Sequence, residues 1–123
     1  MLDDLALLAK TAFADIVTST ELVYRRAGLA EKARLHLRDS TYIDLWVNPA
    51  GTRYSFHWEH RAKRGLIHRH DNAPDHPGLI TFPKHFHNGS ESRVEESHLS
   101  DDPATGLRQF LSFVEEKLDE FGQ

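Results

Sequence analysis

Three short segments in the first half of the chain alternate between apolar and polar residues. They cover residues 33–38, 41–47 and 53–59, and turn sequences separate them: Asp39-Ser40, then Asn48-Pro-Ala-Gly51. Alternation with a period of two places the apolar side chains on one face of a strand. Because the connections are short, consecutive strands should pair directly with one another. The segments therefore predict an antiparallel meander with one buried face and one solvent-facing face.

Two further segments extend this prediction. Residues 17–26 accumulate β-branched side chains, which favour a strand. Residues 66–70 follow a polar turn at 61–65 and form a short strand-like run. The sheet should therefore contain four to six strands.

A helix is expected at each end of the chain. Within residues 3–17, apolar side chains recur at helical spacing, and Asp3 and Asp4 suit the positive N-terminus of a helix. Near the other end, Asp102 is predicted as an N-cap and Pro103 as the first helical residue. An apolar stripe follows, consisting of Leu107, Phe110, Leu111, Val114, Leu118 and Phe121, and Gly122 ends it.

These elements predict one α+β domain over residues 1–123. Its order is an N-terminal helix, an antiparallel meander of four to six strands, a histidine-rich loop, and a C-terminal amphipathic helix packed on one face of the sheet. The chain has no cysteine, which excludes disulfides and thiolate metal sites. It shows no membrane-spanning run, and its acidic N-terminus lacks the basic region of a signal peptide, so we expect a cytoplasmic protein.

Charge is unevenly distributed along the chain. The net charge is −4, yet residues 22–70 are basic and both flanking regions are acidic. A basic middle segment can bind an anionic partner. The alternative is that sheet and helix surfaces simply differ in charge, and the acidic total slightly favours this second interpretation.

The segment from Arg69 to His87 has the composition of a functional loop. It holds four of the nine histidines and three of the five prolines of the chain. Prolines fix rigid turns, while histidines titrate near neutral pH. Function is therefore expected here rather than in the core.

Three histidines of this segment suggest two kinds of chemistry. His85 and His87 form a His-x-His pair, whose rings share one face in an extended chain. Together with His76, and with His68 or His70 as a further ligand, they are suited to a transition metal such as zinc. The alternative is metal-free acid–base catalysis. A solvent-exposed loop without catalytic function is the third interpretation.

Other polar residues complete this candidate site. His57 is expected on the solvent-facing side of its strand, although exposed strand histidines are common. Arg69 is suited to bind a phosphate, and Asp71 to orient a histidine, although the two residues can equally form a surface ion pair. Phosphate-binding glycine loops, nucleophile elbows, His-Glu-x-x-His helices and dinucleotide fingerprints are all missing from the sequence, which disfavours those enzyme classes.

Three sequence blocks resemble the TumE family of small prokaryotic proteins. They are Ser55-Phe-His-Trp58, then Arg69-x-Asp-Asn-Ala-Pro-x-His76, and Thr81-Phe-Pro-x-His-x-His87. The chain differs from the family pattern at Asp75-His76, where two consecutive histidines are expected. The resemblance implies the toxin component of a type II toxin–antitoxin pair, whose antitoxin partner carries a helix-turn-helix domain.

The leading hypothesis is a toxin that acts as a metal-independent ribonuclease. Under this hypothesis, the acid–base groups are four histidines: His57, His76, His85 and His87. Arg69 binds the scissile phosphate, and Asp71 orients a histidine. The residues expected to bind the RNA backbone are Arg34, Arg38, Arg53 and Lys84. The alternatives are a metal-binding protein with His76, His85 and His87 as ligands, and a non-enzymatic module that binds another protein. The sequence leaves open whether the chain forms a homodimer.

Overall fold

A computed structural model describes residues 1–26 and 29–122 and confirms the α+β fold. The elements are α1 (Leu2–Ala12), β1 (Val17–Arg26), β2 (Leu29–Leu37), β3 (Tyr42–Val47), β4 (Tyr54–His60), α2 (Arg61–Arg64), β5 (Leu66–Asp71), β6 (His85–Gly89), β7 (Val94–Glu96) and α3 (Pro103–Phe121). The strands form one antiparallel sheet in the order β1 to β7, so each strand pairs with the next one along the chain. The predicted meander is confirmed, with seven strands instead of four to six.

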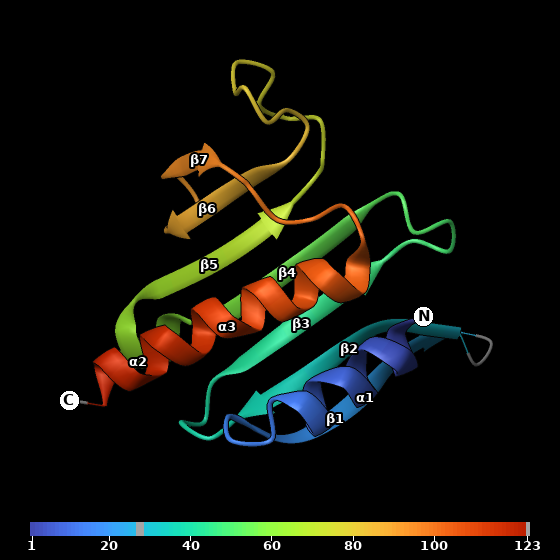
Figure 1. The fold of residues 1–123 in the computed structure, drawn as a ribbon, viewed down its shortest axis with the longest axis vertical. Coiled ribbons are helices and arrows are strands. Elements are labelled where there is room, and N and C mark those ends of the chain that lie inside the picture. The colour runs from blue at the N-terminus through green and yellow to red at the C-terminus, as the bar shows by residue number, and fades with distance from the viewer. Residues whose placement is uncertain (27–28, 123) are drawn as a thin grey trace.

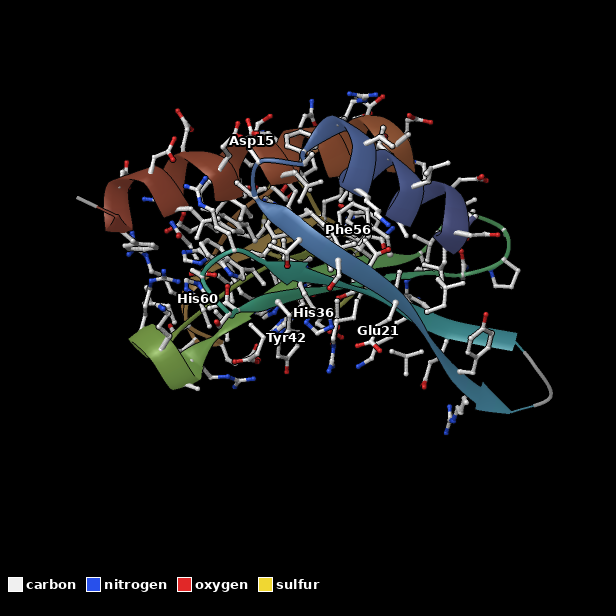
Figure 2. All side chains as sticks on the ribbon, turned by 90° about the horizontal axis from the view of Figure 1, so that it is seen from below. Asp15, Glu21, His36, Tyr42, Phe56 and His60 are labelled. Carbon is white, nitrogen blue, oxygen red and sulfur yellow. The ribbon has the colours of Figure 1, made fainter. Side chains whose placement is uncertain are left out.

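Both long helices lie on the same face of the sheet (Figures 1 and 2). Figure 2 shows Phe56 between the helices and the sheet, whereas Glu21, His36 and Tyr42 point away from the helices. The core forms between these layers, as the alternation of β2, β3 and β4 predicts. We call the helix-covered side the core face and the other side the open face.

Helix α3 begins and ends where the sequence predicts. The Asp102 carboxylate accepts a hydrogen bond of 3.0 Å from the Thr105 backbone N–H, and Pro103 opens the helix. The apolar stripe packs on the core face from Leu107 to Leu118, and the ring centroids of Phe110 and Phe56 are 6.3 Å apart. Phe121 at the end of the stripe is 41% exposed and lies outside the core. The structure therefore confirms the predicted packing of the C-terminal helix.

Helix α1 is shorter than predicted. The expected helix reached residue 17, but α1 ends at Ala12, and the N–H groups of Ile16 and Val17 both donate to the Phe13 carbonyl in a tight turn. The β-branched run that begins at Ile16 favours a strand. Val17 accordingly starts β1 and pairs with Leu37.

The segment 69–87 contains less loop than predicted. Its first residues complete β5 and its last residues belong to β6, which leaves 72–84 as the connecting loop. Strand β7 was not predicted. The Asn88-Gly89 pair starts the turn between β6 and β7, and Gly89 has a φ of 98°, a conformation that glycine adopts without steric cost.

Candidate functional site

Strands β4, β5 and β6 align most of the predicted site residues in two rows. One row pairs His57 with Arg69 and Arg69 with His87. The adjacent row pairs Ser55, Asp71 and His85 in the same way. Paired residues on neighbouring strands project to the same face, and here it is the open face, opposite Phe56 and the helices.

Asp71 lies at the centre of these rows and is 8% exposed. Its Oδ2 accepts a hydrogen bond of 3.1 Å from Arg69 Nε, and its Oδ1 accepts one of 3.0 Å from the Ala73 backbone N–H. The same carboxylate lies 3.0 Å from His85 Nε2 and 3.8 Å from His87 Nε2. The hydrogen bonds from Arg69 and Ala73 replace hydration that the buried carboxylate has lost.

His85 and His87 are both buried, and a backbone carbonyl fixes each ring. The Nδ1 of His85 lies 3.1 Å from the Pro83 oxygen, and the Nδ1 of His87 lies 3.0 Å from the Glu91 oxygen. A carbonyl oxygen only accepts, so each ring carries a proton on Nδ1. Each Nε2 is therefore turned toward Asp71. Burial also lowers the pKa of His87, which favours its neutral form.

The loop 72–84 brings His76 over the same face. Its start is anchored by Asn72, whose side chain accepts from the Tyr54 N–H and donates to the Thr52 carbonyl, at 3.0 and 2.7 Å. Near its end, Thr81 Oγ1 donates to Glu96 at 2.9 Å. The ring centroid of His76 consequently lies 4.6 Å from that of His85 and 5.9 Å from that of His87.

A cavity of about 240 Å³ opens beside these rings. Its lining consists of Trp46, Arg53, Tyr54, Ser55, Arg69, Asp71, Ala73, Asp75, His76, His85 and His87. Five of the six predicted catalytic residues are among them. His57 is not, because Arg69 lies between it and His87 in the sheet.

His57 instead supports Arg69. Its Nδ1 lies 3.3 Å from Arg69 Nη1, and its Nε2 lies 3.1 Å from Glu59 Oε1. Arginine only donates, so the His57 proton is on Nε2 and both ring nitrogens have partners. Glu59 also binds Arg61, whose hydrogen bonds lower the pKa of Glu59 to about 2. This ring is therefore held outside the cavity.

Arg69 is fully engaged by carboxylates. Besides its bond to Asp71, it donates through Nη1 and Nη2 to Glu91 at 3.1 and 2.6 Å. The hydrogen bond to Glu91 is the main cause that raises the pKa of Arg69. Sequence reasoning missed Glu91, although the Asn88-Gly89 turn before it signals a hairpin that returns the chain to β6.

The four residues predicted to bind the RNA backbone are dispersed. Arg34 forms a two-bond ion pair with Asp44, and Arg38 binds Asp119 of α3. Lys84 donates to the Leu99 carbonyl at 2.8 Å. Among these predicted residues, Arg53 alone lines the cavity, and it is exposed.

A second group of histidines lies on the core face. His60, His68 and His70 are buried, and His70 stacks on Phe86 with ring centroids 4.1 Å apart. Burial lowers the pKa of His60 to about 3, that of His68 to about 4 and that of His70 to about 3. The suggestion that His68 or His70 joins the ligands is wrong, because both lie on the opposite side of the sheet from His85 and His87.

Comparison with known proteins identifies one family. The family model described as "Toxin TumE" matches residues 4–118. Searches of curated proteins and of solved structures found no match. Among the helices of residues 1–26 and 29–122, none combines the length and apolar character needed to cross a membrane.

Proposed function

Because the chain belongs to the TumE family of toxins, we propose that it is a ribonuclease and that the cavity on the open face is its active site. The observation that carries this proposal is the position of Asp71, a buried carboxylate that contacts Arg69, His85 and His87 at one cavity. Cleavage of RNA requires a base for the 2′-hydroxyl, an acid for the leaving oxygen and a positive group near the phosphate.

The residues of the cavity match these roles. His87, which burial keeps neutral, presents an unprotonated Nε2 and is suited to act as the base. His76 is half-buried on the loop and is the accessible acid. Arg69 binds the scissile phosphate once Glu91 is displaced, and Arg53 binds an adjacent phosphate at the rim. His57 is not in contact with the substrate and instead positions Arg69.

A toxin of this family has an antitoxin partner. We propose that this partner carries a helix-turn-helix domain, and that the pair acts in the cytoplasm, where RNA is accessible.

The direct test is incubation of the purified toxin with total RNA, together with controlled expression in cells without antitoxin. The wild type is expected to arrest growth and to cleave RNA. His76→Ala and Arg53→Gln are expected to lower cleavage by at least about tenfold. His98→Ala is the matched control, because His98 is exposed and does not line the cavity.

Each alternative outcome has a clear meaning. Intact RNA with correctly folded wild-type toxin would refute the proposal. Growth arrest that survives the loss of His76 and Arg53 would show that the toxin acts through protein binding instead. Cleavage that persists in EDTA identifies metal-free chemistry, which is the route expected from the sequence.

A further inference from the structure

We infer that His76, His85 and His87 bind one divalent transition-metal ion, of which zinc is the best match. The nitrogens through which the three rings could bind all lie within 4.8 Å of one another. In a tetrahedral zinc site with bonds of 2.0–2.1 Å, ligand atoms lie about 3.3 Å apart. Small ring movements would therefore close the group around an ion.

Two of the three proposed ligands lie on a strand, and the third lies on a loop. His85 and His87 lie on β6, and the carbonyls of Pro83 and Glu91 fix their rings by accepting from Nδ1. A hydrogen bond from one ring nitrogen to a carbonyl is the usual way of aiming the other nitrogen at a metal. Within the described part of the chain, the ring of His76 forms no hydrogen bond, so it can rotate to complete the set.

One close contact in this group is of the kind that a bound cation would stabilise. His85 Nε2 carries a lone pair when the proton is on Nδ1, yet it lies 3.0 Å from Asp71 Oδ1, which is also an acceptor. Two buried acceptors at this distance repel each other unless a positive charge lies beside them. A dication bound between the rings would supply that charge, and the third imidazole, that of His76, lies within reach of the same ion.

The charge of Asp71 and the nitrogen ligands of the three histidines determine which kind of ion the site would bind. Asp71 supplies one negative charge next to His85 and His87 and so offsets part of the charge of a dication. Imidazole nitrogens favour zinc, nickel, copper and iron over magnesium or calcium, which prefer oxygen ligands. Three histidine ligands leave a fourth position open toward the cavity of about 240 Å³.

The use of this site in catalysis rests on the proposed function. An ion held by the three histidines would lower the pKa of water at its open position, and His76 and His87 would then act as ligands instead of as acid and base. Metal binding itself is independent of any activity on RNA. The two inferences can therefore fail separately.

The test uses untagged toxin, because a polyhistidine tag would bind the same metals. Elemental analysis is expected to find about one equivalent of metal per chain. After the metal is stripped with a chelator, titration with Zn²⁺ should raise the melting temperature, and Co²⁺ should produce visible absorption bands of an ion bound by nitrogen ligands. His76→Ala should weaken Zn²⁺ binding by at least about 100-fold.

Two controls locate the site. His98→Ala and His36→Gln remove exposed or partly exposed histidines outside the cavity and should bind Zn²⁺ like the wild type. His76 lies on the loop, so its variant is expected to fold, which circular dichroism verifies. His87→Gln provides a second ligand variant on the strand.

Two results would overturn the inference. One is wild-type protein that contains no metal and gains no stability from Zn²⁺ or Co²⁺. The other is unchanged Zn²⁺ affinity in folded His76→Ala. Metal binding with intact RNA would retain the site and refute the ribonuclease, whereas RNA cleavage by a toxin that binds neither Zn²⁺ nor Co²⁺ would retain the ribonuclease and refute the site.

Discussion

Glu91 occupies the position that an anionic substrate would need. Its carboxylate accepts two hydrogen bonds from Arg69, and its side chain is 53% exposed. A carboxylate and a phosphate oxygen pair bind a guanidinium in the same bidentate way. Under the proposed function, Glu91 would therefore compete with a phosphate for Arg69.

Removal of that competition should strengthen anion binding. Glu91→Gln loses the negative charge but keeps the shape of the side chain. Because an exposed ion pair contributes about 0.2–1 kcal/mol, phosphate affinity should rise by roughly 1.4- to 5-fold. NMR titration with inorganic phosphate measures this change. Glu95→Gln on the same hairpin is the control, and an equal gain in both variants would contradict a specific role for Glu91.

At the residue scale, the sequence identified the members of the site better than their roles. Asp71, His85 and His87 lie together because strand alternation, which can be read from the sequence, fixes the face on which each side chain projects. Alternation also places His57 on that face, but it does not reveal that Arg69 separates it from His87. That separation depends on strand register, which only the fold determines.

At the scale of elements, the loop 72–84 depends on Asn72 for its attachment to the sheet. The side chain of Asn72 bridges the Tyr54 N–H and the Thr52 carbonyl next to the start of β4. Asn72→Ala removes both bonds and should lower the free energy of unfolding by about 1–2 kcal/mol. Chemical denaturation measures this loss.

The same variant should affect the site locally. Amide hydrogen exchange in residues 73–80 is expected to accelerate, since the loop loses its first anchor. Asn88→Ala is a suitable control, because Asn88 bonds to Glu95 in a different turn. Unchanged exchange in Asn72→Ala would show that Thr81 and its bonds to Glu96 are enough to hold the loop.

Elements with a strong periodic pattern were predicted well, and irregular ones were not. The alternating strands and α3 match their predicted positions because burial of one face dominates their free energy. Strand β6 was assigned to the loop because prolines and histidines precede it, and β7 has only three residues, too few for a visible period. Both strands can be identified only from their pairing with neighbouring strands in the folded sheet.

At the scale of the whole molecule, the core-face histidines make stability depend on pH. Their pKa values of about 3 to 4 in the folded protein lie below the ordinary value of 6.5. At pH values between the folded-state pKa values and 6.5, the unfolded chain binds more protons than the folded protein. Stability should therefore be fully present above about pH 6.5 and decline as the pH falls toward 3 to 4.

The decline can be assigned to these residues by substitution. Each buried histidine should contribute a slope of about 1.4 kcal/mol per pH unit within the window. His70→Phe should reduce the fall in melting temperature between pH 7 and pH 5, whereas the exposed His98→Phe should not change it. Equal pH profiles for wild type and His70→Phe would show that another group is responsible.

The meander order of the strands also has a consequence for the synthesis of the toxin. Every cavity-lining residue lies between Trp46 and His87, whereas the helix that covers Phe56 on the reverse side begins only at Pro103. A ribosome therefore completes the parts of the site well before it completes the cover of the core. Until α3 has emerged, Phe56 and its neighbours stay exposed to water, and the sheet lacks the burial that would hold it together. The cavity is therefore expected to take its final shape only after α3 has been synthesised and has packed on the sheet.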